Sequence, residues 1–434
     1  MGFSSVSRET LRISLAAAFL AGCALQKEPT ALPSVATTAS RATQDLAKNA
    51  GSFRILHRFA GAPHDGAGPV APMLDVNGTL YGTTVDGGLK GCGYGSGCGT
   101  IFSVSTSGVE KSIYVFAGKS DGWAPYAALI DVSGTLYGTT RYGGGSHCVE
   151  YFGCGTLYTV STSGTESVFY DFGSYPNGTQ PFAGLLDLNG TFYGTTAYGG
   201  SSNGGTVFSL RKSGVEKVLH SFTGGSDGTL PYGNLIAIKG IIYGTTWAGG
   251  AGCGGSGGCG TVFSITPNGA EKILYRFAGG SDGSFPNAGL TEMNGMMYGT
   301  TSPFICCSGN TGWGTVFRVT TTGKEKVLHE FGTGFDGSQP LAGVIAVKGT
   351  LYGTTDTGGS STKCGKYPGG CGTVYSISTN GTEKVLHSFS GGAGGAYAFA
   401  GLTYADGKLF GSTAGGGSTG CGGGGCGTIF SLSP

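Results

Sequence analysis

The sequence predicts an all-β fold and, within that class, a seven-bladed β-propeller with four antiparallel strands in each blade. Three observations lead to this prediction. Four short motifs return together seven times, at a spacing of about 55 residues. Each motif is rich in β-branched and aromatic residues and is bounded by Gly, Asn or Asp, which is the pattern of a strand. Self-similarity at such a period is typical of a propeller or a solenoid rather than of independent domains.

The first motif is a β-rich run that ends in Phe, and the second is an apolar run that follows a Pro. Copies of the first occupy residues 53–59, 111–116, 167–172, 217–222, 272–277, 326–331 and 384–389. Copies of the second occupy 70–76, 126–132, 182–188, 232–238, 287–293 and 341–347, and a seventh copy at 399–405 lacks the Pro. We expect the first motif to form the outer strand of a blade and the second to form the inner strand.

The third motif reads Tyr-Gly-Thr-Thr, and the fourth reads Gly-Thr followed by an aliphatic and an aromatic residue. The third occupies residues 81–84, 137–140, 193–196, 243–246, 298–301 and 352–355, with a degenerate copy at 410–413. The fourth begins at Gly99, Gly155, Gly205, Gly260, Gly314, Gly372 and Gly427. Asn-Gly pairs such as Asn77-Gly78 join the second motif to the third, as expected for a tight hairpin that needs positive φ.

The phase of the repeat predicts how the ring closes. The first strand of the chain, residues 53–59, is of the type that ends a repeat elsewhere, whereas the last, residues 428–432, is the third of its repeat. The N-terminal strand is therefore expected to complete the last blade. Such pairing leaves no open sheet edge, which would otherwise invite aggregation.

The N-terminus has the pattern of an export leader. Arg8 and Arg12 precede a short apolar core, and the sequence Leu-Ala-Gly-Cys that ends at Cys23 resembles the lipobox of bacterial lipoproteins. We expect residues 1–22 to be a lipoprotein signal peptide, Cys23 to carry the lipid, and residues 23–52 to be a disordered tether rich in Ala, Thr, Ser and Pro. The alternative is an ordinary cleaved signal peptide followed by an incidental Cys.

Composition excludes some classes of partner. Charged residues make up 11% of the chain and the net charge is +1, so no basic stripe is available for a nucleic acid. The 90 glycines and 15 prolines fall at fixed places between apolar runs and therefore predict turns rather than disorder. No stretch approaches the length of a membrane-spanning helix.

Residues that recur in nearly every copy are expected to be architectural. His occurs at 57, 220, 329 and 387 where other copies have Tyr, which indicates a flat ring with a polar tip used for packing. Asp precedes Gly in five of the seven outer loops, which indicates a turn. The alternatives are metal ligation or catalysis by the His residues and calcium binding by the Asp residues, but one carboxylate in each loop is few for calcium. We predict no metal and no cofactor.

Twelve cysteines follow Cys23, in six pairs within the Gly-rich loops between the third and fourth motifs. An even count in an exported chain favours disulfides, each contributing roughly 2 kcal/mol for so short a loop. The predicted pairs are Cys92–Cys98, Cys148–Cys154, Cys253–Cys259, Cys364–Cys371 and Cys421–Cys426, while the adjacent Cys306 and Cys307 form either a vicinal disulfide or free thiols. Zinc is disfavoured because pairs on separate blades lie too far apart to supply four ligands.

A ligand site on a repetitive ring should be formed by residues that break the repeat. The copies diverge directly after Thr-Thr, on the face that carries both the Asp-Gly loops and the Cys loops. The candidate ligand-binding residues are Asp86, Arg141, Tyr142, Tyr198, Trp247, Asp356 and Trp123, and further irregular residues nearby are Phe304, Trp313, His147, Glu150 and Tyr151. The simpler interpretation is that these loops vary because nothing constrains them. No catalytic motif or carboxylate pair at a defined spacing occurs, so we assign no catalytic residue.

The motifs also carry a family resemblance over about residues 53–434. The runs Leu-Tyr-Gly-Thr-Thr, Gly-Thr-Val-Phe and Gly-x-Glu-Lys-Val-Leu-His-Ser-Phe resemble the tandem repeat of the bacterial choice-of-anchor GloVer-repeat proteins. The resemblance implies an exported, surface-anchored repeat protein and supplies no activity or catalytic residues. This chain departs from the pattern in its third repeat, which lacks Cys, and in its seventh, which lacks Asp-Gly and an intact Tyr-Gly-Thr-Thr.

Together these features predict a membrane-anchored binding or scaffold module outside the cytoplasm, with no evident catalytic site. We expect an outer-membrane or cell-surface lipoprotein that is a monomer and whose ligand is a carbohydrate or a protein. The alternatives are a glycan-active hydrolase or lyase outside the cytoplasm and a structural subunit of a cell-envelope complex.

Overall fold

The computed structural model describes residues 52–434, with gaps at 64, 93–95, 146–152, 174–175, 251–252, 254–256, 303–311, 333–334 and 365–368. The predicted leader and Cys23 lie outside the described residues, as does the predicted tether except for Ser52. Several other residues named above also lie outside this range: Cys148, Cys306, Cys307, His147, Glu150, Tyr151 and Phe304.

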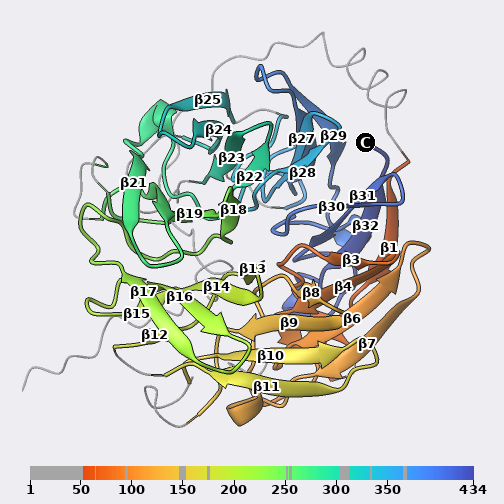
Figure 1. Ribbon diagram of the computed structural model, residues 1–434. Helices are drawn as coiled ribbons and strands as arrows, with labels where there is room; N and C mark the ends of the chain where they lie inside the picture. Colours follow the sequence, from red (N-terminus) through yellow and green to blue (C-terminus); the bar gives the residue numbers. More distant parts are fainter. Residues whose placement is uncertain are drawn as a thin grey trace, which may run out of the picture. The chain divides into compact units, whose positions relative to one another are not determined.

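The described chain is a seven-bladed β-propeller, as predicted (Figure 1). Each blade is one antiparallel sheet whose four strands follow one another from the axis outward. Blades 1 to 3 contain β3 (Leu74–Val76), β4 (Thr79–Thr84), β6 (Thr100–Ser105) and β7 (Glu110–Val115); β8 (Ile130–Val132), β9 (Thr135–Thr140), β10 (Thr156–Ser161) and β11 (Glu166–Asp171); β13 (Leu186–Leu188), β14 (Thr191–Thr196), β16 (Thr206–Arg211) and β17 (Glu216–Ser221). Blades 4 and 5 contain β18 (Ile236–Ile238), β19 (Ile241–Thr246), β20 (Thr261–Ile265) and β21 (Glu271–Arg276); β22 (Thr291–Met293), β23 (Met296–Thr301), β24 (Thr315–Thr320) and β25 (Glu325–Glu330). Blades 6 and 7 contain β26 (Ile345–Val347), β27 (Thr350–Thr355), β28 (Thr373–Ile377) and β29 (Glu383–Ser388); β30 (Thr403–Ala405), β31 (Lys408–Thr413), β32 (Thr428–Leu432) and β1 (Arg54–Arg58).

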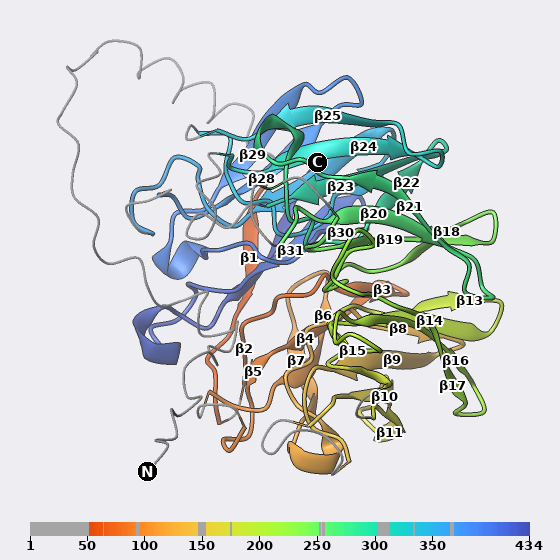
Figure 2. The same ribbon diagram turned by 90° about the vertical axis from the view of Figure 1, so that its left-hand side faces the viewer.

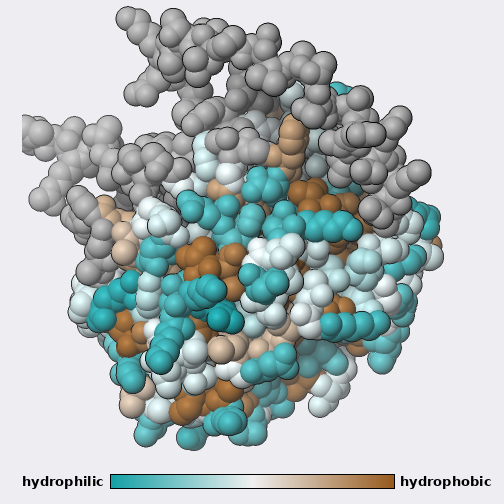
Figure 3. Space-filling model, turned by 90° about the horizontal axis from the view of Figure 1, so that it is seen from above, coloured by the Kyte–Doolittle hydropathy of each residue, from teal (hydrophilic) through white to brown (hydrophobic). Residues whose placement is uncertain are grey.

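The remaining elements are short and lie in the loops. Two loop ribbons pair β2 (Gly66–Ala67) with β5 (Asp86–Gly87) and β12 (Gly178–Thr179) with β15 (Tyr198–Gly199). The 3₁₀ turns are η1 (Lys119–Asp121), η2 (Gly280–Asp282), η3 (Gly392–Gly394) and η4 (Cys421–Gly423). Among the residues that the structure describes, no helix has the length and hydropathy of a membrane span. Figure 3 shows one side of the propeller, on which apolar residues lie in small patches separated by polar ones.

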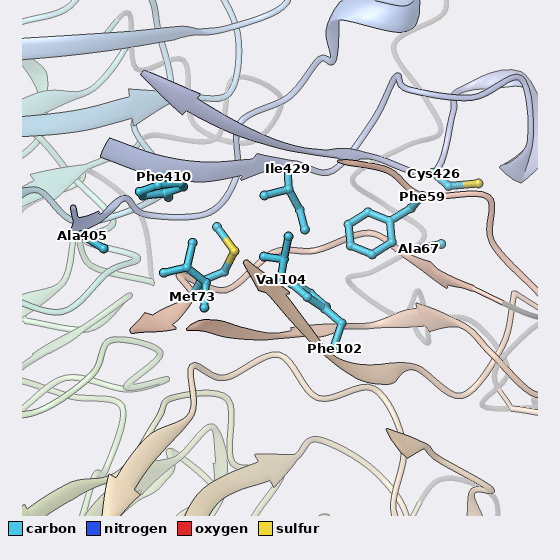
Figure 4. Packing of buried hydrophobic residues seen from close by; sticks show 10 residues of the cluster. Phe59, Ala67, Met73, Phe102, Val104, Ala405, Phe410, Cys426 and Ile429 are labelled. Atoms are coloured by element: carbon cyan, nitrogen blue, oxygen red, sulfur yellow. The ribbon is translucent and has the colours of Figure 1, made fainter. Parts of the chain in front are cut away.

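The ring closes as the phase of the repeat predicts. Strand β1 pairs antiparallel with β32, and β1 is visible at the edge of blade 7 (Figure 2). Just before β1, the ring of Phe53 stacks on His387 of blade 6, with centroids 3.5 Å apart. Beyond β1, Phe59 is fully buried between blades 7 and 1 with Phe102, Phe410 and other residues (Figure 4). The N-terminal segment is thus tied to both neighbours of the closing blade.

The inner strands are shorter than the sequence predicts. The second motif predicts a strand over its whole length, for example 70–76, but ladder pairing covers only Leu74–Val76 and its equivalents. The part nearer the Pro lies against the preceding blade instead, where its backbone carbonyls accept hydrogen bonds from threonine side chains of that blade. In blade 1, for instance, Thr83 Oγ1 donates to the carbonyl of Ala127 in blade 2 at 3.2 Å.

The Thr-Thr pair connects the blades and braces each sheet. The first residue of the pair bonds a carbonyl of the following blade at all seven junctions, with Ser412 replacing Thr in blade 7. The second residue bonds the threonine hydroxyl of the fourth motif, as Thr84 does with Thr100 at 2.8 Å. The glycine of the Asp-Gly loop covers this hydroxyl pair so closely that a Cβ on Gly66 would lie 2.5 Å from Thr84 Cγ2. The loop therefore needs Gly at this position because of close approach.

Four disulfides are present among the described residues, in agreement with four of the predicted pairs. They are Cys92–Cys98, Cys253–Cys259, Cys364–Cys371 and Cys421–Cys426. In each pair the second cysteine directly precedes the Gly-Thr motif, and its carbonyl accepts a hydrogen bond from the loop of the next blade. The disulfides thus hold the segments that surround the central channel.

Candidate functional site at the channel mouth

A cavity of about 240 Å³ lies where the seven blades meet. It is lined mainly by glycine, by alanine and by the residue that follows the recurring Pro of each repeat or, in blade 7, follows Ala398. Those seven residues, one from each blade, are Val70, Tyr126, Phe182, Tyr232, Asn287, Leu341 and Phe399. Because every blade contributes, the cavity is the axial channel of the propeller.

The residue before the Pro, or before Ala398 in blade 7, has a left-handed backbone in every blade. The residues are Gly68, Ala124, Gln180, Leu230, Phe285, Gln339 and Tyr397, with φ between 56° and 63°. Six of them are not Gly, and such a backbone costs of order 1–3 kcal/mol unless the surroundings enforce it. Two backbone hydrogen bonds do so: the N–H donates to the previous blade, and the C=O accepts from the residue after Thr-Thr in its own blade. Strained backbone held in this way is typical of binding and catalytic sites.

In blades 2, 4 and 6 the side chain of the residue after Thr-Thr lies close to that of the left-handed residue of the next blade, and we call the residues at these two positions a mouth pair in every blade. Arg141 Nε donates to Gln180 Oε1 at 3.3 Å, and the rings of Trp247 and Phe285 lie 4.8 Å apart. The mouth pairs of the seven blades are Val85/Ala124, Arg141/Gln180, Ala197/Leu230, Trp247/Phe285, Ser302/Gln339, Asp356/Tyr397 and Ala414/Gly68. The backbone of a mouth pair is the same throughout, whereas its side chains differ from blade to blade.

Seven rings from blades 2 to 5 and their loops form a continuous series of contacts, which we call the aromatic arc. Its members in order of contact are Trp123, Tyr142, Tyr126, Phe182, Tyr232, Trp247 and Phe285, with Arg141 joining Tyr142 to Tyr126. Adjacent ring centroids are between 4.4 and 6.1 Å apart. Tyr142 and Tyr232 are buried, while the other five rings keep part of their surface exposed.

Arg141 is the charged centre of the arc. Its side chain is only 4% exposed, and its guanidinium carbon lies 4.7 Å from the ring centroid of Tyr142, 5.5 Å from that of Tyr126 and 5.4 Å from that of Phe182. Such contacts with ring faces are attractive for a cation. Within the described part of the chain, no carboxylate lies within ion-pair distance of Arg141.

Two acidic residues lie close to aromatic side chains, Asp86 near Tyr126 and Asp356 near Tyr397. Asp86 accepts a hydrogen bond from Ser96 Oγ at 2.6 Å, and burial raises its pKa above the usual range. Burial raises the pKa of Asp356, in blade 6, to about 7. The Asp356 carboxylate in turn contributes to the raised pKa of Tyr397, after the larger effect of burial, which places the two members of this mouth pair close together.

The structure brings together most of the residues singled out by sequence. Trp123, Arg141, Tyr142 and Trp247 belong to the arc, and Tyr198 lies beside Tyr232, whose pKa is raised first by burial and then by Tyr198. Asp86 lies near Tyr126, whereas Asp356 is on blade 6, outside the arc. Sequence reasoning missed the arc residues next to Pro, which are Tyr126, Phe182, Tyr232 and Phe285. They could have been found because they vary beside a nearly constant Pro.

A second group of titratable residues lies between the outer parts of neighbouring blades. The His or Tyr near the end of each outer strand packs edge-on against Phe two residues later. In five of the seven its polar tip points at the Asp of the Asp-Gly loop, as in Tyr114 Oη to Asp121 Oδ1 at 2.7 Å. This agrees with the predicted packing role and with an Asp that also caps the loop backbone. A Glu from the next blade completes what we call an interblade triad. The triads are His57–Asp65–Glu110, Tyr114–Asp121–Glu166, His220–Asp227–Glu271, Tyr275–Asp282–Glu325 and His329–Asp336–Glu383, with Asn177 replacing Asp between Tyr170 and Glu216.

The glutamates of the triads favour the protonated form. Burial, followed by the charge of the neighbouring Asp, raises the pKa of Glu166, Glu271 and Glu325 to about 7. The junction between blades 6 and 7 differs, because Phe53 occupies the Glu position and stacks on His387. Burial lowers the pKa of His387 to about 4, so both rings are neutral there. The ligand atoms of His57, Asp65 and Glu110 lie within 4.8 Å of one another, but the recurrence of the arrangement with Tyr in place of His indicates a packing role.

The sequence profile of the Gloeobacter/Verrucomicrobia repeat matches residues 42–256 and 252–434. The chain belongs to this family. None of the curated proteins compared with this Gloeobacter/Verrucomicrobia repeat protein matches it.

Among solved structures, the repeat protein is similar to phage phi92 endosialidase, with 10% identity, a TM-score of 0.45, and coverage of 89% of this chain and 69% of that one. It is also similar to the PQQ-bound aldose sugar dehydrogenase from Streptomyces coelicolor, with 11% identity, a TM-score of 0.43, and coverage of 89% and 98%. A third similar structure is a luciferin-regenerating enzyme, with 13% identity, a TM-score of 0.42, and coverage of 70% and 88%. At these values the similarity carries no conclusion about activity, which must be inferred from this chain's own residues.

Proposed function

We propose that this repeat protein is an exported, lipid-anchored binding protein that takes a carbohydrate on the aromatic arc at the channel mouth. The observation that carries the proposal is the arc itself. Seven rings contributed by neighbouring blades contact one another at positions where the repeat otherwise varies, and one of them, Phe285, lies at the position whose backbone is left-handed in every blade.

The chemistry of the arc suits a sugar. Pyranose rings have apolar C–H faces that pack on aromatic rings and hydroxyl groups at their edges that need hydrogen-bond partners. Trp123, Trp247 and Phe285 offer partly exposed ring faces, and Gln180 and Gln339 place amide groups at the same rim. Aromatic side chains supply large contact areas at low cost in conformational entropy. The backbone is already fixed before a ligand arrives, so less free energy is lost on binding.

Export and anchoring are supported by the cysteines and by the leader. Short-loop disulfides persist in oxidising compartments. Five of the thirteen cysteines are buried and have a backbone carbonyl that accepts a hydrogen bond from the left-handed residue of the next blade. They are Cys98, Cys154, Cys259, Cys371 and Cys426. A lipid on Cys23 would hold the domain at a membrane surface through burial of acyl chains.

A glycan-active enzyme is the second candidate, and Asp356 is the residue that favours it. A carboxyl group whose pKa is about 7 can donate or accept a proton at neutral pH. Asp356 would then act as the general acid or base on a sugar held by the arc. Turnover that is lost in Asp356→Asn while binding persists would support this activity.

The test is binding of the purified mature domain to a glycan array and, for each hit, titration calorimetry. Trp247→Ala should weaken binding at least tenfold, because loss of a partly exposed ring that stacks on the ligand costs about 1.4 kcal/mol or more. Phe335→Ala is the matched control, since Phe335 is an aromatic residue that is 73% exposed in an outer loop. If the variants bind equally, or if no glycan binds, the proposal fails.

A further inference from the structure

Arg141 has a buried charge that no carboxylate among the described residues neutralises. A buried cation is tolerated when a carboxylate and hydrogen-bond acceptors replace water. A guanidinium carries five N–H donors. Arg141 has Gln180 Oε1 as an acceptor, at 3.3 Å from Nε, and the hydroxyl of Tyr126 as a second partner. The three ring faces around it offset part of the lost hydration, but they accept no conventional hydrogen bond.

The acidic residues at the mouth do not supply the missing charge. The Asp86 carboxylate is bonded to Ser96 on blade 1, and Asp356 belongs to the mouth pair of blade 6, with Tyr397. Neither forms an ion pair with Arg141. Within the residues that the structure describes, the guanidinium therefore has no anionic partner, and a group from outside the chain can take that place.

We propose that Arg141 binds a carboxylate of the ligand, so that the saccharide taken by the arc is an acidic one built from uronic acid units. The proposal rests on the carbohydrate-binding function proposed above and adds the class of sugar. A guanidinium matches a carboxylate through two parallel N–H···O bonds in one plane. The rings of Tyr142, Tyr126 and Phe182 fix the plane of the guanidinium in advance, which lowers the entropy lost on binding.

A saccharide is favoured over an acidic peptide by the surroundings of the charge. Aromatic rings continue from Arg141 in both directions along the arc, to Trp123 on one side and to Trp247 on the other. An oligosaccharide presents a flat face in every unit and, when built from uronates, a carboxylate at a regular interval. It can therefore stack on the arc and bond Arg141 in a single orientation.

The test compares trigalacturonate with its methyl ester, because esterification removes the charge and keeps the sugar. Calorimetry on the mature domain should show the acid binding at least about tenfold more tightly than the ester, with an advantage that falls as salt rises. Arg141→Gln should bind both forms with the same low affinity. Arg141→Lys, which keeps the charge but loses the two parallel N–H donors of the guanidinium, should retain part of the preference for the acid over the ester. Arg211→Gln is the matched control, since Arg211 is exposed on the outer part of blade 3.

Each outcome bears on the proposal. Equal binding of acid and ester, unchanged in Arg141→Gln, would overturn the acidic assignment while leaving the carbohydrate function in place. No binding of either form, or of any neutral glycan, would overturn both. Binding of an acidic peptide without binding of the uronate would overturn the choice of ligand class. Thermal unfolding distinguishes a ligand-binding role of Arg141 from a structural one. If Arg141 serves to bind the ligand, the Tm of Arg141→Gln should be unchanged or higher. A lower Tm together with an intact preference for the acid would refute the proposal.

Discussion

Replacing Glu325 with Gln is expected to stabilise the propeller at pH 8 and to leave its stability at pH 5 unchanged. Glu325 of blade 5 completes an interblade triad with Tyr275 and Asp282 of blade 4. Burial, and then the charge of Asp282, raises its pKa from the ordinary value of 4.5 to about 7. The folded state therefore favours the neutral carboxyl. The stability associated with this preference is fully present below pH 4.5 and is lost as the pH rises through 7.

The size of the effect follows from the two pKa values. A difference from 4.5 to about 7 corresponds to at most about 3 kcal/mol at pH 8. Because the carboxyl is only half-buried, solvent screening reduces this to roughly 1–2 kcal/mol. Gln is neutral at every pH and has the same shape, so Glu325→Gln should unfold with a free energy about 1–2 kcal/mol higher than the parent at pH 8.

Guanidinium denaturation at pH 5 and pH 8 measures the effect, with Glu330→Gln as the matched control. Glu330 lies in the same strand, β25, and is exposed, so its substitution should change stability little at either pH. A Glu325→Gln variant that is less stable than the parent at pH 8 would refute the reasoning, because it would mean that the ionised carboxylate is stabilising.

Three further outcomes are expected. Gly66→Ala should lower the free energy of unfolding, measured by urea denaturation, by about 1–3 kcal/mol, since its Cβ would lie 2.6 Å from Thr84 Oγ1. Gly257→Ala is the control and should be neutral, because the space around Gly257 is open. Equal stability of the two variants would argue against the close approach at Gly66. Phe53→Ala should destabilise the propeller by roughly 2–3 kcal/mol through loss of the stack on His387, whereas Phe335→Ala should not. Hydrogen exchange in Phe53→Ala should show that β1 and β32 open first. Slow exchange in these two strands would contradict the closure argument. For an acidic ligand, affinity should rise as the pH falls from 8 to 6 because Asp356 takes up a proton, and calorimetry on Asp356→Asn should show that rise abolished; the same pH dependence in the variant would assign it to another group.

The fold was predictable because its signals are local and repeated. The Pro before the inner run, Tyr-Gly-Thr-Thr and Gly-Thr each recur with the same neighbours, and the leftover first strand predicts the pairing of β1 with β32. The length of the inner strands was not predictable in this way. It depends on threonine side chains that bond carbonyls of the next blade, as Thr83 does with Ala127, and such a contact leaves no pattern within one repeat.

The site was predictable only in part, for a related reason. Variation after Thr-Thr points to Arg141 and Trp247, but the partners of these residues, Gln180 and Phe285, belong to the following blades. Their positions become visible only once the ring is assembled. The left-handed backbone that presents them has no residue signature either, since Ala, Gln, Leu, Phe and Tyr all occupy it. Backbone bonds to the neighbouring blade, rather than the residue type, impose that conformation.

The uniform backbone of the mouth pairs separates recognition from folding. Each member of a pair is held by backbone hydrogen bonds within its own blade or to the preceding one, and these bonds do not involve its side chain. Exchanging Arg141 with Ser302, whose pair partners Gln180 and Gln339 are both glutamine, should therefore move the positive charge three blades around the axis while every sheet keeps its register. In a propeller of this kind, the side chains that bind a ligand can be moved from one blade to another without altering the fold, either in evolution or by design.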